Sequence, residues 1–395
     1  MKILFLSPSV PFPLISGGRL RTASIVNALG RNEIYFLALQ DPDVPADRGE
    51  LQKYVKDFKF VSHKPHFGWG DPLYKKLLRV IYLALGIPSP VVRDFNPEFA
   101  GLVKRYVREL EPDIVVVDFL WLAQYIKPLK GKFRRVLNAH NVESDVFRTT
   151  RKSFVFWLPW KIWKRYEART VRDFDLVLVT SENEKKRFLE LNPSGNYLVV
   201  PNAVNTSLFK FKPYTRRGGL VFTGNFSHLP NVDAATFFVK SVFPLIRERA
   251  PRVQFSIVGS DPPAEVTALG KVPGVGVFSN VPDAKPYISS AAVAVVPIRS
   301  GSGTRLKILE AFALGTPVVS TSFGAGGLMV DSGKDLIIGD NAESFADAVV
   351  SLLNNQDLGR KITTRARKTV EDKYSWELVE KIISKSDLMR ESGKD

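Results

Sequence analysis

The sequence contains no cysteine and only four histidines in 395 residues. The lack of cysteine excludes disulfide bonds, thiolate metal sites and cysteine nucleophiles. The small number of histidines argues against a multi-histidine metal site. Acidic residues are also in deficit, because 40 Asp and Glu face 56 Lys and Arg and leave a formal net charge of +16. This balance predicts a polyanionic partner: nucleic acid, an anionic membrane surface or phosphorylated substrates.

No apolar run reaches the length of a transmembrane helix, which needs about 20 residues. The apolar start Met1–Leu6 is followed at once by Pro8, Pro11 and Pro13. That pattern is typical of a first β-strand and a loop, and it argues against a signal peptide. We therefore expect a cytoplasmic protein, which can also lie peripherally on the inner face of the cytoplasmic membrane.

Two further observations concern cofactors. The first strand is not followed by a Gly-x-Gly-x-x-Gly turn, which argues against a dinucleotide-dependent oxidoreductase. Asp41 and Asp43 flank a proline, and such a pair can hold a divalent cation bound to diphosphate. The pair lies in a polar loop after a strand, so a turn explains it better. We expect no metal and no other cofactor.

Short apolar strands alternate with helical patterns along the whole chain. Continuous apolar strands separated by helices indicate parallel sheets covered on both faces, so the expected fold class is α/β with doubly wound sheets. The length is enough for two such domains. The expected strands span Lys2–Ser7, Ile34–Leu39, Lys59–Val61, Ile114–Val117, Val136–Ala139, Leu176–Thr180, Tyr197–Val200, Leu220–Thr223, Val253–Val258, Val275–Phe278, Val293–Pro297, Val318–Ser320 and Leu336–Ile338.

A polar segment marked by glycine and proline, Asn205–Gly219, predicts a linker between the domains. We expect one domain over residues 1–205, a second over 206–373 and a C-terminal helix over 374–395. The expected helices include Arg19–Leu29, Pro97–Glu109, Val232–Arg249, Asp261–Gly270, Thr304–Leu314 and Ala342–Leu353.

The most informative segment of the chain is Gly301–Val319. A Gly-Ser-Gly turn after an apolar strand leaves free N–H groups at the start of a helix, where the helix dipole favours an anion. Arg305 and Lys307 can add full positive charge beside that anion. Glu310, about two turns into the expected helix, can accept two hydrogen bonds from the vicinal hydroxyls of a ribose. The segment predicts a site for a nucleoside diphosphate that carries a further group.

Each of these residues also has a plainer interpretation. The glycines can form an ordinary turn, and Arg305 with Lys307 can be a solvated charged face. Glu310 is flanked by apolar residues, and a carboxylate in such surroundings needs partners. The combination at the carboxyl end of one strand favours the functional interpretation.

The block Pro297–Val319, followed by Phe323–Leu328, resembles the retaining glycosyltransferases of family 4. Val200-Pro201-Asn202, the opening Val221–Gly224 and the closing Tyr374-Ser375-Trp376 support the resemblance, which spans nearly the whole chain. It implies the GT-B fold, in which two Rossmann-like domains face a central cleft and the last helix crosses back to the first domain. The first domain is then expected to bind the acceptor and the second the nucleotide-sugar donor.

The resemblance also implies roles for individual residues. Glu310 matches the glutamate that holds the donor ribose, and His140 matches the histidine beside the transferred sugar, although a histidine satisfied at a strand end is the alternative. Arg305 and Lys307 are the expected charge partners of the diphosphate. The further donor-binding positions are Gly17 and Gly18 in a flexible glycine loop, Gly224 and Asn225, and the turn Ser302, Gly303 and Thr304.

The chain departs from the family pattern in three places. Ser302 stands where the family often has a first glutamate, which usually contacts the sugar. The Gly-Arg…Lys phosphate motif of the second domain is replaced by Gly224–His228. The usual Asn-Gly-Val-Asp after the first domain is replaced by Asn202–Asn205. The sugar is therefore left open, and Arg305 and Lys307 are expected to supply the missing positive charge.

In the reaction implied by the resemblance, the acceptor attacks the anomeric carbon on the face from which the diphosphate leaves. Helix-end N–H groups with Arg305 and Lys307 are expected to stabilise the leaving phosphate, which helps to take the acceptor's proton. Asp118 follows an expected strand and either faces the acceptor or caps a helix.

Aromatic and basic residues alternate in the segment Phe147–Arg172. Helical spacing predicts a basic face opposite an aromatic face, which is typical of an interfacial membrane helix. A helix packed on the core with a solvated basic face is the alternative. The residues expected at the acceptor or membrane are Trp157, Trp160, Trp163, Lys161, Lys164 and Arg165, with Trp69, Tyr74, Lys75, Lys76 and Arg79 as an extension.

The leading functional prediction is a retaining, nucleotide-sugar-dependent hexosyltransferase acting on a glycan or lipid-linked acceptor, in bacterial polysaccharide or glycoconjugate synthesis. An epimerase-like enzyme that acts on a nucleotide sugar without an acceptor is an alternative. A basic nucleic-acid-binding or membrane-binding protein without transferase activity is another, but no nucleic-acid motif is present and nucleic acid is not the expected partner.

Overall fold

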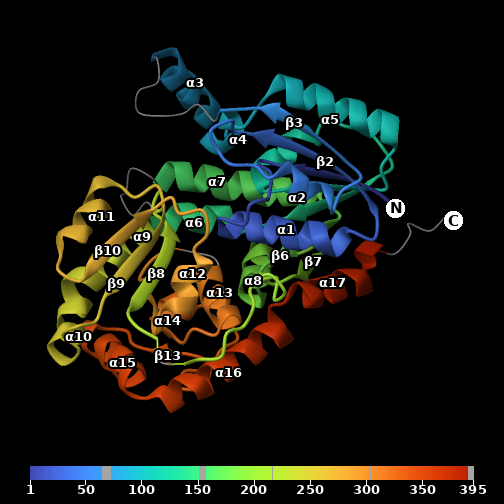
Figure 1. The fold of residues 1–395 in the computed structure, drawn as a ribbon. Coiled ribbons are helices and arrows are strands. Elements are labelled where there is room, and N and C mark those ends of the chain that lie inside the picture. Colours follow the sequence, from blue (N-terminus) through green and yellow to red (C-terminus); the bar gives the residue numbers. More distant parts are fainter. Residues whose placement is uncertain (65–72, 151–156, 216, 302–304, 390–395) are drawn as a thin grey trace. The chain divides into compact units, whose positions relative to one another are not determined.

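The computed structural model describes residues 1–64, 73–150, 157–215, 217–301 and 305–389. Within these residues the chain divides into two compact units. Unit 1 comprises Met1–Pro201 together with Val379–Asp395, and unit 2 comprises Asn202–Leu378. Both are α/β units built on parallel sheets, as the alternating pattern of the sequence predicts (Figure 1).

Unit 1 contains a seven-stranded sheet in the order β3-β2-β1-β4-β5-β6-β7. Its central strands are buried on both faces, which parallel sheets require because helices cover them. The strand order reverses between β1 and β4, and the carboxyl ends of such neighbouring strands are where doubly wound sheets bind ligands. The strands are β1 Lys2–Ser7, β2 Glu33–Gln40, β3 Asp57–Ser62, β4 Ile114–Asp118, β5 Arg134–Asn138, β6 Leu176–Val179 and β7 Tyr197–Val199.

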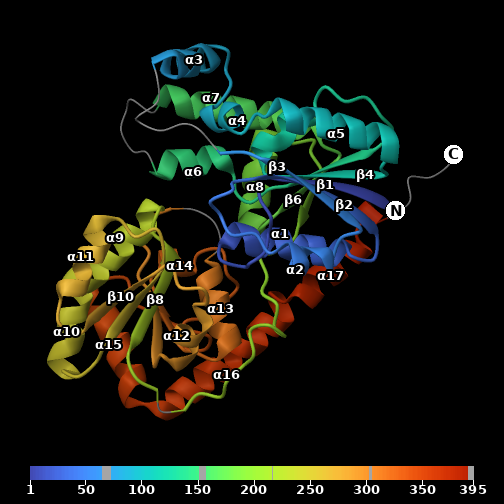
Figure 2. The same ribbon diagram turned by 45° about the horizontal axis from the view of Figure 1, so that its top comes forward.

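Helices cover both faces of this sheet. In both views α5 lies on one side of the sheet and α1 on the other (Figures 1 and 2). A 3₁₀ turn over Leu120–Tyr125 follows β4. The α-helices are α1 Gly17–Leu29, α2 Arg48–Gln52, α3 Leu73–Ala84, α4 Ser89–Arg93, α5 Pro97–Leu110, α6 Glu143–Thr150, α7 Trp157–Thr170 and α8 Glu182–Leu191.

Unit 2 contains a six-stranded sheet in the order β10-β9-β8-β11-β12-β13. The order reverses between β8 and β11, so the loops after these two strands lie at the corresponding ligand-binding edge. The strands are β8 Leu220–Asn225, β9 Phe255–Ser260, β10 Val275–Ser279, β11 Val293–Val296, β12 Val318–Ser320 and β13 Ile337–Ile338.

The helices of unit 2 follow the expected segments with local differences caused by proline. The expected helix Val232–Arg249 is interrupted by a π-helical turn over Phe238–Val242, next to Pro244, which has no N–H to continue the α-helical pattern. Pro262 and Pro263 delay the start of α11. The helices are α9 Leu229–Phe237, α10 Phe243–Arg249, α11 Ala264–Ala268, α12 Lys285–Ser290, α13 Leu306–Leu314, α14 Ser322–Ala325, α15 Ala342–Asn354 and α16 Gln356–Lys373.

The last α-helix, α17 Trp376–Lys385, begins in unit 2 and ends in unit 1. On the unit 1 side, Ile383 and Leu388 are buried, and Arg31 forms a salt bridge with Glu380 at 2.8 Å. The C-terminal segment is therefore part of the packing of unit 1, although it is last in the sequence.

Candidate functional site

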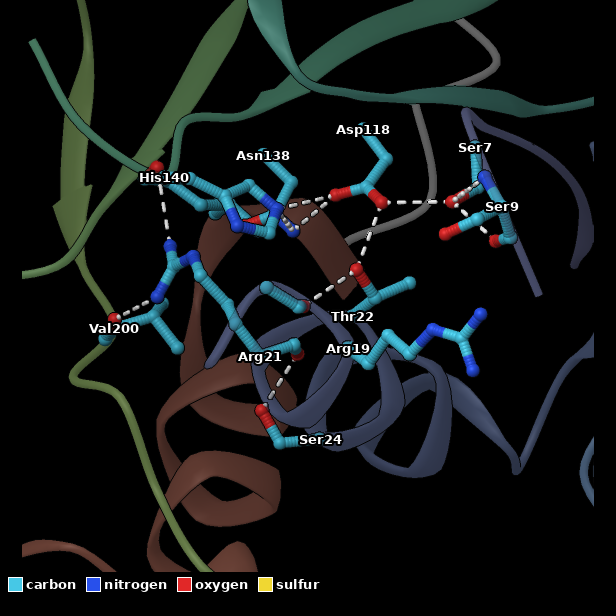
Figure 3. A network of polar contacts seen from close by, with 12 residues as sticks. Ser7, Ser9, Arg19, Arg21, Thr22, Ser24, Asp118, Asn138, His140 and Val200 are labelled. Carbon is cyan, nitrogen blue, oxygen red and sulfur yellow. Dashed lines mark hydrogen bonds and ion pairs between the residues drawn. The ribbon is translucent and has the colours of Figure 1, made fainter. Parts of the chain in front are cut away.

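The first candidate site lies where β1 and β4 end, at the reversal of strand order in unit 1. Asp118, the last residue of β4, is fully buried. One carboxylate oxygen accepts hydrogen bonds from Ser7 Oγ at 2.9 Å and Thr22 Oγ1 at 2.8 Å (Figure 3). The other accepts from Asn138 Nδ2 at 2.8 Å and lies 2.7 Å from His140 Nε2. Four partners therefore surround this carboxylate, and they come from β1, α1, β5 and the loop that follows β5.

This environment corrects the expectation for Asp118. A carboxylate with no exposed surface and four hydrogen-bond partners neither faces an acceptor nor caps a helix. Its contact with His140 gives it a different role. Because the carboxylate accepts, Nε2 of His140 carries the proton, and Nδ1 is left as a hydrogen-bond acceptor. Burial lowers the pKa of His140, which keeps the ring neutral.

The ring of His140 is held from a second direction by Phe119. The two rings stack with centroids 3.6 Å apart and planes inclined by 14°. Phe119 has a φ of 71°, a left-handed conformation that is strained for a bulky side chain. Such strain is typical of functional sites, where the surrounding structure compensates for it. Here it places the aromatic ring against the histidine.

Gly17 and Gly18 form the first turn of α1, which corrects the expectation of a flexible loop before the helix. Ser16 caps this helix by accepting a hydrogen bond from the N–H of Arg19. A Cβ atom on Gly18 would lie 3.4 Å from the Phe119 ring and 3.8 Å from Nδ1 of His140. The glycine therefore brings a helix N-terminus close to the unprotonated edge of the histidine.

Behind this cluster lies Arg21, a fully buried arginine that the sequence analysis did not single out. It donates hydrogen bonds to the carbonyl oxygens of Val200 at 2.8 Å and Leu178 at 3.3 Å (Figure 3). Burial lowers the pKa of Arg21 to about 10, while Glu184 and Asp118 act in the opposite direction. Arg21 thus ties α1 to β6 and to the end of β7.

The second candidate site lies at the reversal of strand order in unit 2. Lys307, in the first turn of α13, donates to Oδ1 of Asn231 at 2.9 Å and lies over the Phe222 ring at 4.2 Å. Asn231 Nδ2 in turn donates to the carbonyl oxygen of Asn225 at 2.6 Å. The loop after β8 is thereby joined to the helix after β11. Burial, with Arg305 nearby, lowers the pKa of Lys307 to about 7.

Arg305 immediately precedes α13 and occupies its N-cap position. Its guanidinium donates to the carbonyl oxygen of Ser300 at 3.3 Å and lies 5.8 Å from the centre of the Phe323 ring. Burial lowers its pKa to about 10. Two cationic side chains are therefore desolvated beside the start of one helix, an arrangement that favours an anionic ligand.

Glu310 lies one turn into α13, not two, because the helix begins at Leu306. Burial raises its pKa to about 7, and Lys307 and Lys285 lower it in part. Among the described residues, no side chain or N–H donates a hydrogen bond to its carboxylate. A half-buried carboxylate of this kind can accept hydrogen bonds from a polar ligand.

The remaining donor positions divide into two groups. Gly224 and Asn225 end β8, where Asn225 Oδ1 accepts hydrogen bonds from the N–H and hydroxyl of Ser227 at 2.8 and 2.6 Å. Ser302, Gly303 and Thr304 lie outside the described residues.

Across the described ranges, no group of three or more His, Asp or Glu side chains could hold a metal ion.

The aromatic–basic segment contains α7, whose aromatic face packs mainly on the protein. Trp163 is 5 % exposed and joins the core of unit 1, with Tyr166 packed against that core. The expectation that Trp163 faces a membrane is therefore wrong. Trp160 is half-buried, whereas Trp157 is exposed, with Lys161 Nζ 3.8 Å from its ring centre. Lys161, Lys164 and Arg165 are exposed. Of the described helices, none is long and apolar enough to span a bilayer.

Sequence reasoning missed several residues that the fold brings into the two sites. Ser7, Thr22, Asn138 and Phe119 surround the Asp118–His140 pair, and Asn231 positions Lys307. The available signal was that polar residues end the apolar strands at Ser7, Asp118 and Asn138. The order of the strands, which makes these ends neighbours, is visible only in the structure.

Two Rossmann-like units, one with a cationic helix start beside a half-buried carboxylate, define a glycosyltransferase of the GT-B type. Family models support this class over most of the chain. The model described as "Glycosyltransferase Family 4" matches residues 17–208, and the model described as "Glycosyl transferases group 1" matches residues 217–355. The chain belongs to this glycosyltransferase family.

Two curated proteins are similar in sequence. An "Uncharacterized 44.6 kDa protein in cps region" of Klebsiella pneumoniae is 20% identical, covering 94% of this chain and 96% of the relative. A phosphatidyl-myo-inositol mannosyltransferase of Mycobacterium leprae is 28% identical over 46% of this chain and 50% of its own length. The chain thus matches only about half of the mannosyltransferase.

Solved structures share the fold at low sequence identity. A sucrose-phosphate synthase from Thermosynechococcus elongatus has a TM-score of 0.71 and 17% identity, covering 97% of this chain and 98% of that chain. HepE of Anabaena in complex with UDP has a TM-score of 0.64 and 15% identity, with the same coverage of both chains. These similarities establish the GT-B architecture.

Proposed function

We propose that this chain transfers a hexosyl group from a nucleoside-diphosphate sugar to a glycan or lipid-linked acceptor, with retention at the anomeric carbon. The observation that carries this proposal is the start of α13, where Arg305, Lys307 and Glu310 lie within one and a half turns of helix. Two desolvated cations suit a diphosphate, and a carboxylate that receives no hydrogen bond from the described residues suits the hydroxyls of a ribose.

The chemistry proposed for unit 2 is electrostatic. As the bond between the anomeric carbon and the diphosphate oxygen breaks, negative charge collects on the leaving phosphate. Arg305 and Lys307 stabilise that charge without reorganisation, because α13 and Asn231 already hold them in place. The acceptor oxygen bonds to the same face of the sugar, and its proton passes to the leaving phosphate.

We propose that His140 binds the transferred sugar. Its neutral ring, with Nε2–H bound to Asp118, presents Nδ1 as an acceptor for a hydroxyl. Its place beside the first turn of α1 fits a role for Gly17 and Gly18 near the same group. We propose no metal, because the two cations of unit 2 supply the charge that a metal would bring.

We propose bacterial polysaccharide or glycoconjugate synthesis as the setting of this reaction. The mannosyltransferase relative carries phosphatidyl-myo-inositol in its name, which supports a lipid-linked acceptor. The base of the donor and the sugar are left open by this proposal, and the following experiment is designed to identify the base.

The test is a thermal-shift screen of the wild type and Glu310→Ala against UDP, GDP, ADP, TDP and NAD. A ligand that binds only the folded state raises the melting temperature by mass action. We expect one diphosphate to raise the melting temperature of the wild type. Loss of the ribose contacts should weaken its binding to Glu310→Ala by about 10- to 100-fold, since hydrogen bonds to charged groups contribute about 1.5–3 kcal/mol.

Absence of a shift with every diphosphate would contradict the proposal. Once the base is known, incubation with the matching nucleotide sugar alone separates transfer from an epimerase-like activity. Conversion of the sugar without an acceptor would favour the epimerase-like activity.

A further inference from the structure

Asn231, in the first turn of α9, uses both ends of its side-chain amide. Its Oδ1 accepts a hydrogen bond from Lys307 Nζ at 2.9 Å, and its Nδ2 donates to the carbonyl oxygen of Asn225 at 2.6 Å. Exchange of the amide oxygen and nitrogen would set Nδ2 against the ammonium group, and both are donors. A Cβ atom on Gly224 would lie 3.0 Å from Cγ of Asn231, so the glycine leaves room for this amide. The amide therefore presents its oxygen to Lys307 in one fixed direction.

The same helix also holds the loop between β11 and α13. Asp233 of α9 accepts two hydrogen bonds from the guanidinium of Arg299, at 2.7 and 3.2 Å. That guanidinium lies 4.1 Å from the centre of the Phe237 ring, which is also on α9. The next residue, Ser300, is the one whose carbonyl oxygen accepts a hydrogen bond from Arg305. Arg305 is therefore bonded to a loop that α9 anchors.

The end of β8 and the start of α9 bring little charge of their own to this edge of the sheet. The segment Gly224–Asp233 contains no lysine or arginine, and His228 is its only basic residue. Its polar side chains contact the residues around the start of α13 instead. The contribution of this segment to the donor site is therefore the placement of the cations and not additional positive charge.

We propose that Asn231 and Asp233 are positioning residues for a nucleoside diphosphate bound at the start of α13. Asn231 acts through Lys307, and Asp233 acts through Arg299 and the loop that carries Arg305. Cations that are already held in place stabilise a diphosphate without the entropic cost of ordering them during binding. This inference rests on the proposed function and deepens it, because it assigns the placement of both cations to α9.

The contact with Asn231 has a consequence for the proton of Lys307. Burial, with Arg305 nearby, lowers the pKa of Lys307 to about 7, and Glu310 acts in the opposite direction. His228, at the start of α9, is the other ionisable group that interacts with Lys307. A carboxylate in place of the amide favours the charged lysine, whereas loss of the amide oxygen disfavours it. Asn231→Asp should therefore raise the pKa of Lys307, and Asn231→Ala should lower it.

The test is isothermal titration calorimetry of the full chain with UDP, GDP, ADP and TDP between pH 6 and 9. We expect the affinity of the wild type for its diphosphate to weaken above pH 7, as Lys307 loses its proton. In Asn231→Asp this weakening should begin about one pH unit higher. Asn231→Ala should bind about tenfold more weakly at pH 7, but should change the affinity of Lys307→Met by less than about twofold, because it acts through the lysine.

Asp233→Asn should also weaken binding, by about three- to tenfold, because the loop before Arg305 loses its anchor. The matched control is Asp347→Asn, which breaks the salt bridge with Arg249 elsewhere in unit 2. It should bind the diphosphate as the wild type does. Every variant is compared by its melting curve without nucleotide, which shows whether it is folded.

An unchanged pH profile in Asn231→Asp would overturn this inference. Equal losses from Asn231→Ala with and without Lys307 would also overturn it, since they would indicate a merely structural role. If the wild type binds no diphosphate, the proposed function fails instead. The pKa of Lys307, measured by NMR of its side chain without nucleotide, then tests the contact by itself, and an equal pKa in the wild type and Asn231→Asp would overturn the role of Asn231.

Discussion

At the scale of single residues, the candidate sites depend on polar side chains whose partners come from distant parts of the sequence. The carboxylate of Asp118 is the clearest case, since it contacts Ser7, Thr22, Asn138 and His140. Only His140 among these also offers a free ring edge toward α1. Asp118 is therefore a positioning residue, which acts through the tautomer and orientation of His140.

Asp118→Asn should lower kcat by about 10²-fold or more, because an amide can donate to Nε2 and shift the proton to Nδ1. Nucleotide-induced stabilisation should not change, since the nucleotide is proposed to bind unit 2. The measurements are kcat, the thermal shift with nucleotide, and the ¹⁵N chemical shifts of the imidazole, which report the tautomer. Ser7→Ala removes another donor to the same carboxylate and should retain most of the activity. Equal losses in the two variants would contradict the positioning role.

Lys307→Met should stabilise the protein and strongly lower its kcat. The pKa of Lys307 is lowered to about 7 in the fold, so the charged form is disfavoured there relative to the unfolded chain. Wild-type stability should therefore rise between pH 7 and the ordinary lysine pKa near 10.5, where only the unfolded state keeps the proton. At pH 6 we expect the melting temperature of the variant to exceed that of the wild type by about 2–4 °C.

This difference should shrink by pH 9, and kcat should fall by about 10²–10³-fold at all pH values. The measurements are melting curves at several pH values and steady-state kinetics. Lys361→Met, on an exposed lysine of the same unit, should show neither effect. A difference in melting temperature between variant and wild type that stays constant with pH would contradict the lowered pKa of Lys307 in the fold.

At the scale of the elements, the strand ends place the loops that carry the chemistry. Gly224 of β8 and Gly259 of β9 are paired neighbours in the sheet of unit 2. A Cβ atom on Gly259 would lie 1.7 Å from the carbonyl oxygen of Gly224. The close approach of these strands therefore requires glycine and sets the position of Asn225, which accepts a hydrogen bond from Asn231.

Gly259→Ala should lower the free energy of unfolding by about 1–3 kcal/mol, as overpacking generally does. It should also reduce the nucleotide-induced thermal shift, because the end of β8 must move. Denaturant unfolding and the thermal-shift screen measure the two effects. In Gly218→Ala the new methyl group meets no atom within 4 Å, so this variant serves as the control. If Gly259→Ala bound nucleotide as tightly as the wild type, the loop after β8 would not belong to the proposed donor site.

At the scale of the whole molecule, the last residues of the chain belong to the packing of its first domain. Val379 and Ile383 are fully buried and Leu388 nearly so, all within unit 1. Stability of unit 1 thus depends on a segment that follows unit 2 in the sequence.

Ile383→Ala should lower the free energy of unfolding of unit 1 by about 2–5 kcal/mol, through lost burial and the cavity left behind. Differential scanning calorimetry should show an earlier transition that does not respond to nucleotide. The nucleotide-dependent transition of unit 2 should keep its response. Lys385→Ala, on an exposed residue of the same helix, should leave both transitions in place. If Ile383→Ala instead weakened nucleotide binding, the two units would not be independent in stability.

The sequence determined the fold class and nearly all of the strands. Apolar runs such as Lys2–Ser7 and Val318–Ser320 coincide with β1 and β12, because strands buried on both faces must be continuously apolar and are bounded by polar turns. Helix starts were less well predicted. The prolines before α11 and the position of Arg305 before α13 moved the observed boundaries by one to three residues.

The sequence also indicated the charge at the proposed donor site, since Arg305, Lys307 and Glu310 are neighbours along the chain at the start of α13. The tertiary structure alone decided which polar residues became partners. Ser7, Asp118 and Asn138 are far apart in the sequence, and the strand order brings them together. The tertiary structure also decided which apolar side chains are buried. Trp163 lies in the core, whereas Leu77 and Leu85 are exposed, although all three are apolar. Local sequence sets the side chains and the period of a helix, whereas the surface that a helix covers depends on its neighbours in space.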